Sequence, residues 1–341
     1  MSAKLTILRA GPLMTVQDMG RPGRIADGLS PGGAMDRLAL LEGAALLGLA
    51  KPAQAIEMAG MGGRFRCDTP LRFALSGAPM RAQIDDMPLR WNASHKLEPG
   101  QTLTIASVSS GTYGYLTPGG GIAGTELLGS VAAHLSVGLG RPLAEGDILT
   151  LGEDPSPGRP PRGIVSEDRF GGGSLRIMPG PQTELFDDAT RGRLAQTSFH
   201  RSPRANRTGL PLLQEGEGFA PADPVSPLSD FIIAGDLQMT GDGTPYLMLA
   251  ECQTIGGYPR IGTVIAADLP RAAQAPPSAR LRFTWITSDA ADRLYLSEAQ
   301  IMAALAGRAQ PLVRDPADIP DLLSYQLIDG VTAGRELDPE P

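Results

Sequence analysis

Short apolar or alternating runs, each closed by Gly or Pro, recur along most of this 341-residue chain. Examples are LTILRAG and LRFALSG in the first half, and TPYLMLA and RLRFTWI in the second. Runs of about four to eight residues bounded by turn residues are typical of β-strands. The pattern predicts a mainly β protein of the sandwich or barrel kind, with few helices, rather than alternating layers of helix and strand.

Three stretches have apolar residues at the three- and four-residue spacing of a helix. The first covers about residues 35–49 and is stopped by Pro52. The second lies within PQTELFDDATRGRLAQTSF, after the predicted strand LRIMPG. The third is SEAQIMAALAGRAQ, for which we expect Ser297 as the N-cap and Gly307 as the stop. Between two later strands, the Gly-Asp-Gly at residues 241–243 predicts a hairpin turn.

The spacing of these elements predicts two lobes. Residues 1–155 form a β-rich lobe with one helix, and residues 175–310 form a second β lobe. Residues 156–174 are rich in Pro and Gly and show little periodicity, so they are the best candidate for a linker. Residues 311–341 are expected to be a C-terminal tail.

Composition narrows the class of protein. Hydrophobic residues make up 42% and charged residues 20%, which is enough apolar surface for real cores. The formal net charge of -7 argues against binding to nucleic acid, because that binding depends on clustered Lys and Arg. No apolar run reaches the ~18 residues of a membrane span, and the N-terminus does not resemble a secretory signal. The two cysteines, Cys67 and Cys252, form no CxxC pair, so we expect a reducing compartment, the cytoplasm.

The first candidate site is the glycine-rich stretch 20–34, which runs directly into the first predicted helix. Ser30 and Pro31 occupy the helix-entry loop, and Asp36 and Arg37 stand at the first turn. Exposed backbone amides and the positive end of the helix dipole favour an anion at such a place. An equally good interpretation is that Asp36 only caps the helix and Arg37 is solvated.

Two further loops concentrate glycine. Residues 116–130 contain a Gly triplet but no Lys after it, so they lack the phosphate-binding GxxxxGK[ST] pattern, and a tight turn is the favoured interpretation. Residues 250–274 place Gln253, a Gly-Gly pair, Tyr258 and Arg260 between two apolar strands, where site residues can be held rigidly. The alternative is a structural turn with Tyr258 as a lid on the core.

Other kinds of site have little support. The three histidines, His95, His134 and His200, show no metal-ligand spacing, so no metal site is predicted. No GxSxG motif is present, so a hydrolase triad is not predicted either. The residues by themselves indicate a two-lobed β protein whose Gly-rich loops suit small anions or amides.

The same stretches resemble a known family. GPLMTVQDMGRPG, SPGGAMDRLAL, AIEMAG, LSGAPM, YLTPGGGI, MPGPQTELF, SPRANRTG and QTIGGYPRIGTVIAADLPRAAQ occur in the order of the allophanate hydrolase subunit 2 family. That family is also described as the 5-oxoprolinase C subunit or biotin-dependent carboxyltransferase family. The resemblance covers about residues 4–285. It implies two cyclophilin-like β-barrel lobes and a partner chain, a subunit 1 relative similar to the 5-oxoprolinase B subunit.

The resemblance implies a subunit of a heteromeric enzyme that processes amides or lactams. The first expectation is the C subunit of an ATP-dependent 5-oxoprolinase, or a carboxyltransferase subunit that acts on urea-like amides. Further partners would be a lactam-utilisation A subunit or a biotin carboxylase. We expect this chain to hold no cofactor firmly, with ATP or carboxybiotin reaching it through the complex. The alternative is a non-catalytic binding protein that antagonises a kinase inhibitor.

This chain departs from the family pattern at four positions. Ala123 stands where an acidic residue is common, and Val131 replaces an Arg. Thr208 and Pro211 stand where Met and Arg are usual. The lost Arg at Val131 is the change that favours the non-catalytic alternative.

Candidate roles follow from the resemblance and from side-chain chemistry. Arg207 and Arg37 are expected to hold a carboxyl group, with Asn206 beside them in the substrate-binding set. Substrate is expected between the lobes and the partner chain.

Residues of the third loop, together with Asp36, complete the expected site. Gln253 and the backbone amides of Gly256 and Gly257 are expected to bind an amide oxygen as charge develops on it. Asp36 or Tyr258 would relay a proton. These turns, far apart in the sequence, are predicted to converge on one hollow that a second polypeptide closes.

Overall fold

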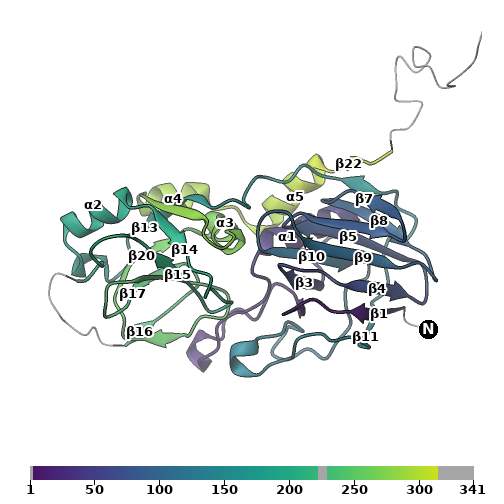
Figure 1. Ribbon diagram of the computed structural model, residues 1–341, viewed down its shortest axis with the longest axis horizontal. Helices are drawn as coiled ribbons and strands as arrows, with labels where there is room; N and C mark the ends of the chain where they lie inside the picture. The colour runs from purple at the N-terminus through teal and green to yellow at the C-terminus, as the bar shows by residue number, and fades with distance from the viewer. Residues whose placement is uncertain (1–2, 222–228, 314–341) are drawn as a thin grey trace, which may run out of the picture.

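The computed structural model describes residues 3–221 and 229–313, which form two lobes lying side by side (Figure 1). The lobe formed by the first half of the chain consists of two antiparallel sheets. The second lobe is a closed barrel. The prediction of a mainly β chain with few helices and two lobes is therefore confirmed.

The first lobe contains a six-stranded and a seven-stranded sheet. In the order in which they pair, the six strands are β11 (Ile148–Thr150), β1 (Lys4–Arg9), β4 (Arg64–Cys67), β9 (Leu103–Val108), β6 (Met80–Ile84) and β7 (Met87–Leu89). The seven are β2 (Thr15–Gln17), β3 (Ala55–Ala59), β10 (Tyr113–Pro118), β5 (Leu71–Gly77), β8 (Ala93–Leu97), β12 (Arg162–Gly163) and β22 (Gln310–Pro311). Alternating side chains from both sheets form one buried core, to which Ile7, Phe65, Phe73 and Leu116 belong.

Helix α1 (Arg37–Leu47) is the helix predicted at about residues 35–49. It packs on β5, β8 and β10 of the seven-stranded sheet. Gly43 allows the close approach, since a Cβ there would lie 2.7 Å from Thr117 Oγ1. The opposite face of α1 is also covered, because α5 (Glu298–Arg308) packs on it through Leu305. Nearly every residue of α1 is therefore buried.

The second lobe is expected to extend to residue 310, but α5, which lies within that range, packs on the first lobe. Ser297 caps the helix with a complete capping box, as predicted, but the helix runs through Gly307 to Arg308. The chain thus returns from the second lobe to the first, and β22 pairs with β12 there. An amphipathic pattern reveals an apolar face, but it does not reveal which distant surface that face will cover.

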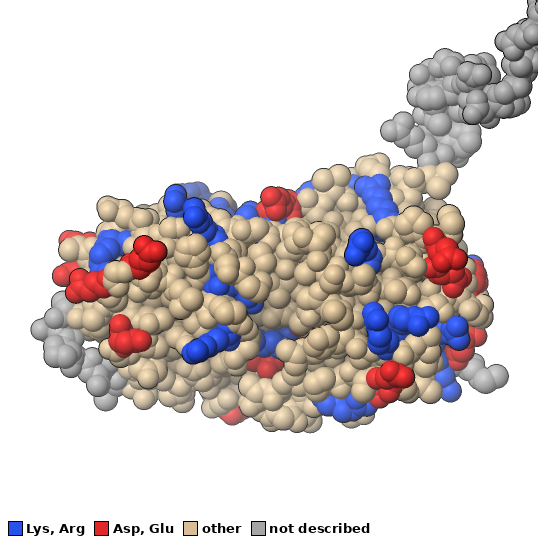
Figure 2. Space-filling view, in the orientation of Figure 1, with Lys and Arg blue, Asp and Glu red and all other residues tan. Residues whose placement is uncertain are grey.

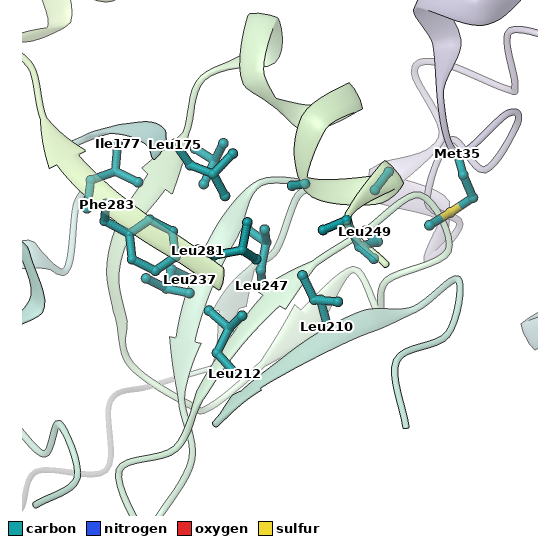
Figure 3. Close-up of a cluster of buried hydrophobic side chains, with 14 of the residues drawn as sticks. Met35, Leu175, Ile177, Leu210, Leu212, Leu237, Leu247, Leu249, Leu281 and Phe283 are labelled. Atoms are coloured by element: carbon teal, nitrogen blue, oxygen red, sulfur yellow. The ribbon is translucent and has the colours of Figure 1, made fainter. Parts of the chain in front are cut away.

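The second lobe is a seven-stranded closed barrel with a buried interior (Figure 3). In the order in which they pair, its strands are β13 (Gly173–Met178), β20 (Arg260–Val264), β17 (Asp236–Met239), β18 (Pro245–Met248), β15 (Gly209–Leu213), β14 (Phe199–Arg201) and β21 (Arg280–Trp285). β13 and β21 pair in parallel and close the ring. The predicted turn at residues 241–243 does join β17 to β18.

The remaining helices and strands are short and lie outside the two main sheets and the barrel. They are α2 (Asp188–Gln196), α3 (Leu269–Gln274), α4 (Ser288–Leu294), the small sheet of β16 (Asp230–Phe231) and β19 (Ile255–Gly256), and the 3-10 turns η1 (Ile25–Asp27), η2 (Leu135–Val137), η3 (Thr183–Leu185) and η4 (Ala266–Asp268). The second predicted helix is thus η3 followed by α2. The sequence patterns did not indicate α3 or α4.

One apolar core runs from the barrel into the first lobe. Met35 and Tyr115 of the first lobe belong to the same buried cluster as Leu247 and Leu249 of the barrel. In Figure 3, Met35 lies at the end of the barrel nearest Leu249. Because this cluster is continuous, the two lobes are packed against each other as one body.

The segment 156–174, which its composition suggested as a linker, lies along the first lobe before entering the barrel. Its strand β12 pairs with β8, and Ile164 is buried beside α1. Arg169 is also buried and contacts carboxylates of the first lobe. Pro and Gly gave this segment an irregular path, while a few anchoring side chains fix it in place.

No helix among the described residues is long and apolar enough to cross a membrane. On the face shown in Figure 2, acidic and basic side chains are interspersed over both lobes. The described residues on this face form no continuous basic surface of the kind that phosphate backbones attract.

Candidate functional site

The junction between the lobes contains a buried ionic network around Arg169. Its guanidinium binds Asp36 through Nε at 2.8 Å and Glu42 through both terminal nitrogens at 2.8 and 2.9 Å. Asp36 also accepts from the Ala39 amide and so caps α1. Burial raises the pKa of the Asp36 carboxyl, and the Arg169 guanidinium opposes that rise. Asp36 is fully buried, so the capping interpretation describes its role here.

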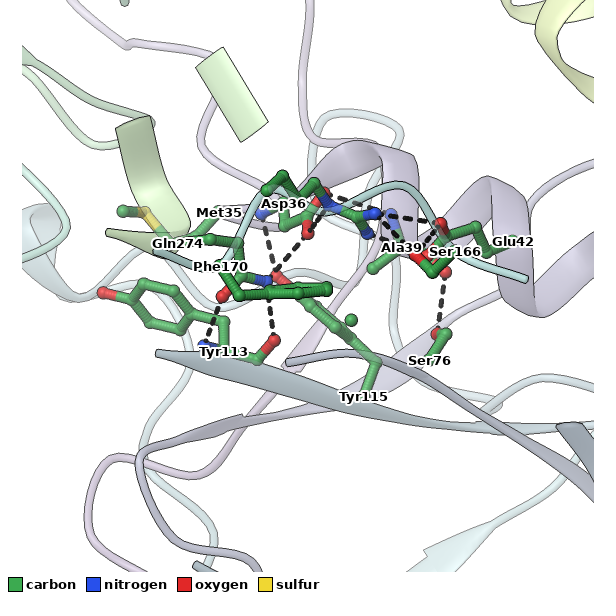
Figure 4. A network of polar contacts seen from close by, with 12 residues as sticks. Met35, Asp36, Ala39, Glu42, Ser76, Tyr113, Tyr115, Ser166, Phe170 and Gln274 are labelled. Carbon is green, nitrogen blue, oxygen red and sulfur yellow. Dashed lines mark hydrogen bonds and ion pairs between the residues drawn. The ribbon is translucent and has the colours of Figure 1, made fainter. Parts of the chain in front are cut away.

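The second lobe reaches into this network through Gln274, at the end of α3 (Figure 4). Its amide nitrogen donates to Asp36 and to the Tyr113 carbonyl, both at 2.8 Å. On the other side, the Tyr115 hydroxyl accepts from the Asp36 amide and donates to Glu57. Hydrogen bonds therefore link α1, strand β10 of the seven-stranded sheet and the second lobe.

Arg207 forms a second ionic link between the lobes. It comes from the loop before β15, and its guanidinium contacts Glu57 of the first lobe and Glu251 of the second. It also donates to the Gly33 carbonyl at 2.6 Å. Burial lowers the pKa of Arg207, but the two carboxylates outweigh that effect and leave it above the ordinary value. Burial raises the pKa of Glu57, and Arg207 opposes the rise.

A cavity of about 340 Å³ opens beside Arg207, between the lobes. We call it the junction cavity. Its wall is formed by Gly28, Ser30, His134, Ser136, Val137, Thr208, Glu251, Cys252, Gln253, Thr254 and Ile255. The first five of these residues come from the first lobe and the rest from the second. Hydroxyl, imidazole, amide and carboxylate groups thus converge on one hollow.

His134 is the most enclosed polar group of this wall, with an exposed fraction of 1%. Its Nε2 lies 2.9 Å from Ser30 Oγ, and its Nδ1 lies 3.0 Å from Ser136 Oγ. Gly32 allows this approach, because a Cβ there would lie 2.7 Å from the imidazole ring. Burial lowers the pKa of His134, while Glu251 opposes that shift.

The structure brings together only part of the predicted site. Arg207 and Gln253 lie at the junction, and Asp36 is connected to Arg207 through Glu57 and Tyr115. Arg37 lies elsewhere, on the outer side of α1, where it pairs with Glu298 of α5. Arg37 and Arg207 therefore do not form one clamp, since Arg37 is an exposed partner of Glu298 whereas Arg207 is held between Glu57 and Glu251.

The remaining predicted residues lie in loops around the junction. Asn206 accepts from the Thr208 and Gly209 amides, which stabilises the turn that carries Arg207. Gly256 is in β19, and a Cβ there would meet Ile232 and approach the amide of Gln253.

Gly257 and Tyr258 follow β19 on the surface, where Tyr258 is 50% exposed. An exposed Tyr does not act as a lid on the core. Gly119–121 form a tight turn after β10, in keeping with the favoured interpretation of the glycine triplet.

Of the four departures from the family pattern, one lies in the cavity wall. Thr208 lines the cavity, and its carbonyl accepts from the Leu249 amide. Val131 is in the loop before His134, where its amide donates to Asp18. Ala123 and Pro211 are engaged in backbone pairing away from the cavity wall.

The main residues that sequence reasoning missed are the buried acids Glu57 and Glu251 and the buried base Arg169. Glu57 sits inside the apolar run AIEMA and Glu251 inside LMLAEC, so each interrupts a buried strand or its end. A charge in such a run is costly unless it is paired, which was the available signal. The signal does not identify the partner, however. Arg207 lies more than a hundred residues from Glu57, and Asp36 lies more than a hundred residues from Arg169.

These features define a two-lobed β protein with a charged, polar junction and a cavity between sheet lobe and barrel. The family model described as carboxyltransferase domain, subdomain A and B, matches residues 27–285. The chain belongs to this family.

Two curated relatives match over nearly their whole length. The C subunit of 5-oxoprolinase from Escherichia coli is 31% identical over 308 residues, which cover 89% of this chain and 98% of that protein. The protein of the same name from Haemophilus influenzae is 30% identical, covering 85% of this chain and 94% of its own length. A putative urea carboxylase of Emericella nidulans is 28% identical over 82% of this chain but only 24% of its own length.

Solved structures share the fold. The crystal structure of TTHA0988 has a TM-score of 0.75 at 29% identity over 83% of this chain, which covers 56% of that longer protein. The urea amidolyase of K. lactis has a TM-score of 0.79 at 22% identity, over 92% of this chain and 21% of that one. The second likeness concerns the fold alone.

Proposed function

We propose that this chain is a subunit of a heteromeric amide-processing enzyme, and specifically the C subunit of a 5-oxoprolinase. One observation carries the proposal. The chain aligns with 98% of the 5-oxoprolinase C subunit of E. coli, whereas it aligns with only 24% of the urea carboxylase relative. The alignment therefore supports the 5-oxoprolinase C subunit over the urea carboxylase as the nearer functional counterpart.

The junction cavity is the proposed binding place for the lactam. 5-Oxoproline presents a lactam carbonyl oxygen, a lactam N–H and a carboxylate, and the wall offers hydroxyl, imidazole and amide groups that can form hydrogen bonds with them. Gln253 keeps its proposed role as an amide-oxygen ligand, since it lies on this wall. Arg207 stands behind the wall and holds Glu251 in place, so its proposed role becomes positioning rather than direct binding.

Exposed apolar side chains around the cavity mouth support the need for a partner. Val137 and Ile255 line the cavity and are 50% and 56% exposed. Phe231, which pairs with Ile255 in the small sheet, is 55% exposed. A partner chain similar to the 5-oxoprolinase B subunit would cover these residues and close the cavity, as the resemblance implies.

Reconstitution tests the proposal. The chain, purified with partners similar to the B and A subunits of 5-oxoprolinase, should convert 5-oxoproline and ATP to glutamate, and omission of this chain should abolish the product. A parallel reaction with carboxybiotin and urea tests carboxyl transfer, which the urea carboxylase relative makes the second candidate. Glutamate formation that is unchanged without this chain counts against an enzymatic role. So does the absence of both glutamate and carboxylated urea when all subunits are present, and either result leaves the binding-protein alternative.

We also propose that this chain is located in the cytoplasm.

A further inference from the structure

A serine, a histidine and a glutamate from three separate segments meet in the wall of the junction cavity. Ser30 lies before α1, His134 before η2, and Glu251 after β18. Ser30 Oγ is 2.9 Å from His134 Nε2, and Glu251 Oε2 is 3.8 Å from His134 Nδ1. A hydroxyl, an imidazole and a carboxylate in this order are the parts that activate a serine nucleophile.

We assign to His134 the tautomer that carries its proton on Nδ1. Ser136 donates from its hydroxyl to the Glu251 carbonyl at 3.5 Å and from its amide to the Glu251 carboxylate at 3.0 Å. Its hydroxyl oxygen is then the acceptor for the His134 Nδ1–H at 3.0 Å. This tautomer, assigned from the network, leaves the lone pair of Nε2 facing the Ser30 hydroxyl. That is the form in which His134 acts as a base toward Ser30.

The surrounding charges fit a neutral imidazole that gains a proton only transiently. Burial is the largest effect and lowers the pKa of His134. Glu251 favours the imidazolium, whereas Arg207 and Arg21 disfavour it. A neutral imidazole is available to accept a proton at neutral pH.

We propose that Ser30 is a nucleophile, activated by His134, that accepts small acyl groups from esters or amides bound in the junction cavity. Both side chains line that cavity, whose volume of about 340 Å³ suits a ligand of small size. The inference uses the same cavity as the proposed lactam site, but labelling of Ser30 needs neither 5-oxoproline nor a partner chain, so the two proposals can fail separately.

The reaction balances without any further reagent but water. Ser30 Oγ attacks the carbonyl carbon while its proton passes to His134 Nε2. The bond from that carbon to the leaving oxygen or nitrogen then breaks, and His134 protonates the leaving group. Water, deprotonated by His134, next attacks the acyl-serine, and His134 returns that proton to Ser30 Oγ as the carboxylic acid is released.

The geometry predicts a slow reaction. Nδ1 is bonded to the neutral Ser136 hydroxyl, and the Glu251 carboxylate stands farther off, so the imidazolium receives less support than from a directly bonded carboxylate. Covalent labelling is therefore a better readout than turnover.

The full-length chain is incubated with a fluorophosphonate carrying short alkyl groups, and the adduct is followed by intact mass and peptide mapping. We expect one adduct per chain, on Ser30. Ser30→Ala should remove it, and His134→Gln should lower the labelling rate at least about tenfold. The wild-type rate should rise with pH and level off with an apparent pKa below 6.5, the ordinary value of His134.

Ser76→Ala is the matched control, since Ser76 is fully buried and its hydroxyl donates to the Ala39 carbonyl instead of to an imidazole. Its labelling should equal that of the wild type. If His134→Gln does not fold, Ser136→Ala serves in its place and should also slow labelling. Absence of label on the wild-type chain, label elsewhere than Ser30, or a rate on Ser30 unaffected by both variants overturns the proposal.

Discussion

The side-chain amide of Gln274, in the second lobe, donates a 2.8 Å hydrogen bond to the carboxylate of Asp36, which caps α1 in the first lobe. The same amide donates to the Tyr113 carbonyl, and its oxygen accepts from the amides of Thr112 and Tyr113. One side chain of the barrel thus satisfies four polar groups of the first lobe. The orientation of the lobes therefore depends on a small number of buried contacts.

Replacing Gln274 by Ala should loosen the junction. The substitution leaves the Thr112 and Tyr113 amides and one Asp36 oxygen without this partner, at a cost of about 1–3 kcal/mol in the free energy of unfolding. Hydrogen exchange at Thr112 and Tyr113 should become faster. Gln101→Ala, whose side chain accepts from the nearby Glu98 amide at the surface, is the control. Unchanged protection at both amides would show that Gln274 does not hold the junction.

Replacing Arg207 by Ala should destabilise the whole chain as well as abolish activity of the reconstituted complex. The guanidinium neutralises Glu57 and Glu251, and removing it leaves two buried carboxylates uncompensated. Loss of one partner from a buried ion pair costs about 3–5 kcal/mol. Chemical denaturation measures this cost.

Arg37→Ala is the comparison for Arg207. Its pair with Glu298 is solvent-exposed, with side-chain exposures of 48% and 55%. Exposed pairs of this kind contribute about 0–1 kcal/mol. Equal losses for the two variants would contradict the difference in burial on which this prediction depends.

Replacing Leu305 by Ala should destabilise the first lobe, although Leu305 follows the second lobe in sequence. Leu305 is 5% exposed and packs against α1, so its truncation leaves a cavity at a cost of about 2–5 kcal/mol. Proteolysis should then begin in the first lobe. Leu296→Ala, at a residue that is 53% exposed, should change little. Initial cleavage confined to the barrel would mean that α5 stabilises the barrel and not the first lobe.

The lowered pKa of His134 predicts how the free energy of unfolding depends on pH. Burial holds the pKa of His134 below its ordinary 6.5 in the folded chain, whereas the unfolded chain binds the proton near 6.5. The unfolded state thus binds more protons within this window, and stability is lost as the pH falls from 6.5 toward the folded-state pKa. The loss is at most about 1.4 kcal/mol per pH unit.

His134→Gln cannot take up that proton and should lack this component. Urea unfolding of both proteins at about pH 7.5 and about pH 5.5 isolates it, because all other groups are shared. The stability difference between wild type and variant should shift against the wild type at the lower pH. A difference that stays constant over the two pH values would mean that His134 does not titrate in this range.

The strands and most helix ends could be predicted from local patterns. Gly and Pro closed each apolar run, and the Ser297 cap and the turn at residues 241–243 follow from short-range hydrogen bonding. The order of the motifs along the chain was enough to indicate the family. Local patterns did not show which distant surface an element would cover. Helix α5, for example, covers α1 and not the barrel.

The two-lobed β organisation and the carboxyltransferase-like family follow from the sequence alone, because periodicity, turn residues and motif order are properties of neighbouring residues. Which polar residues act together became evident only in the folded chain. It buried Asp36 as a cap, left Arg37 at the surface, and placed Arg207 between Glu57 and Glu251. It also brought His134 to Ser30 across 104 residues. Those pairings arise from sheet topology and lobe packing, which fix distances between segments that no local pattern relates.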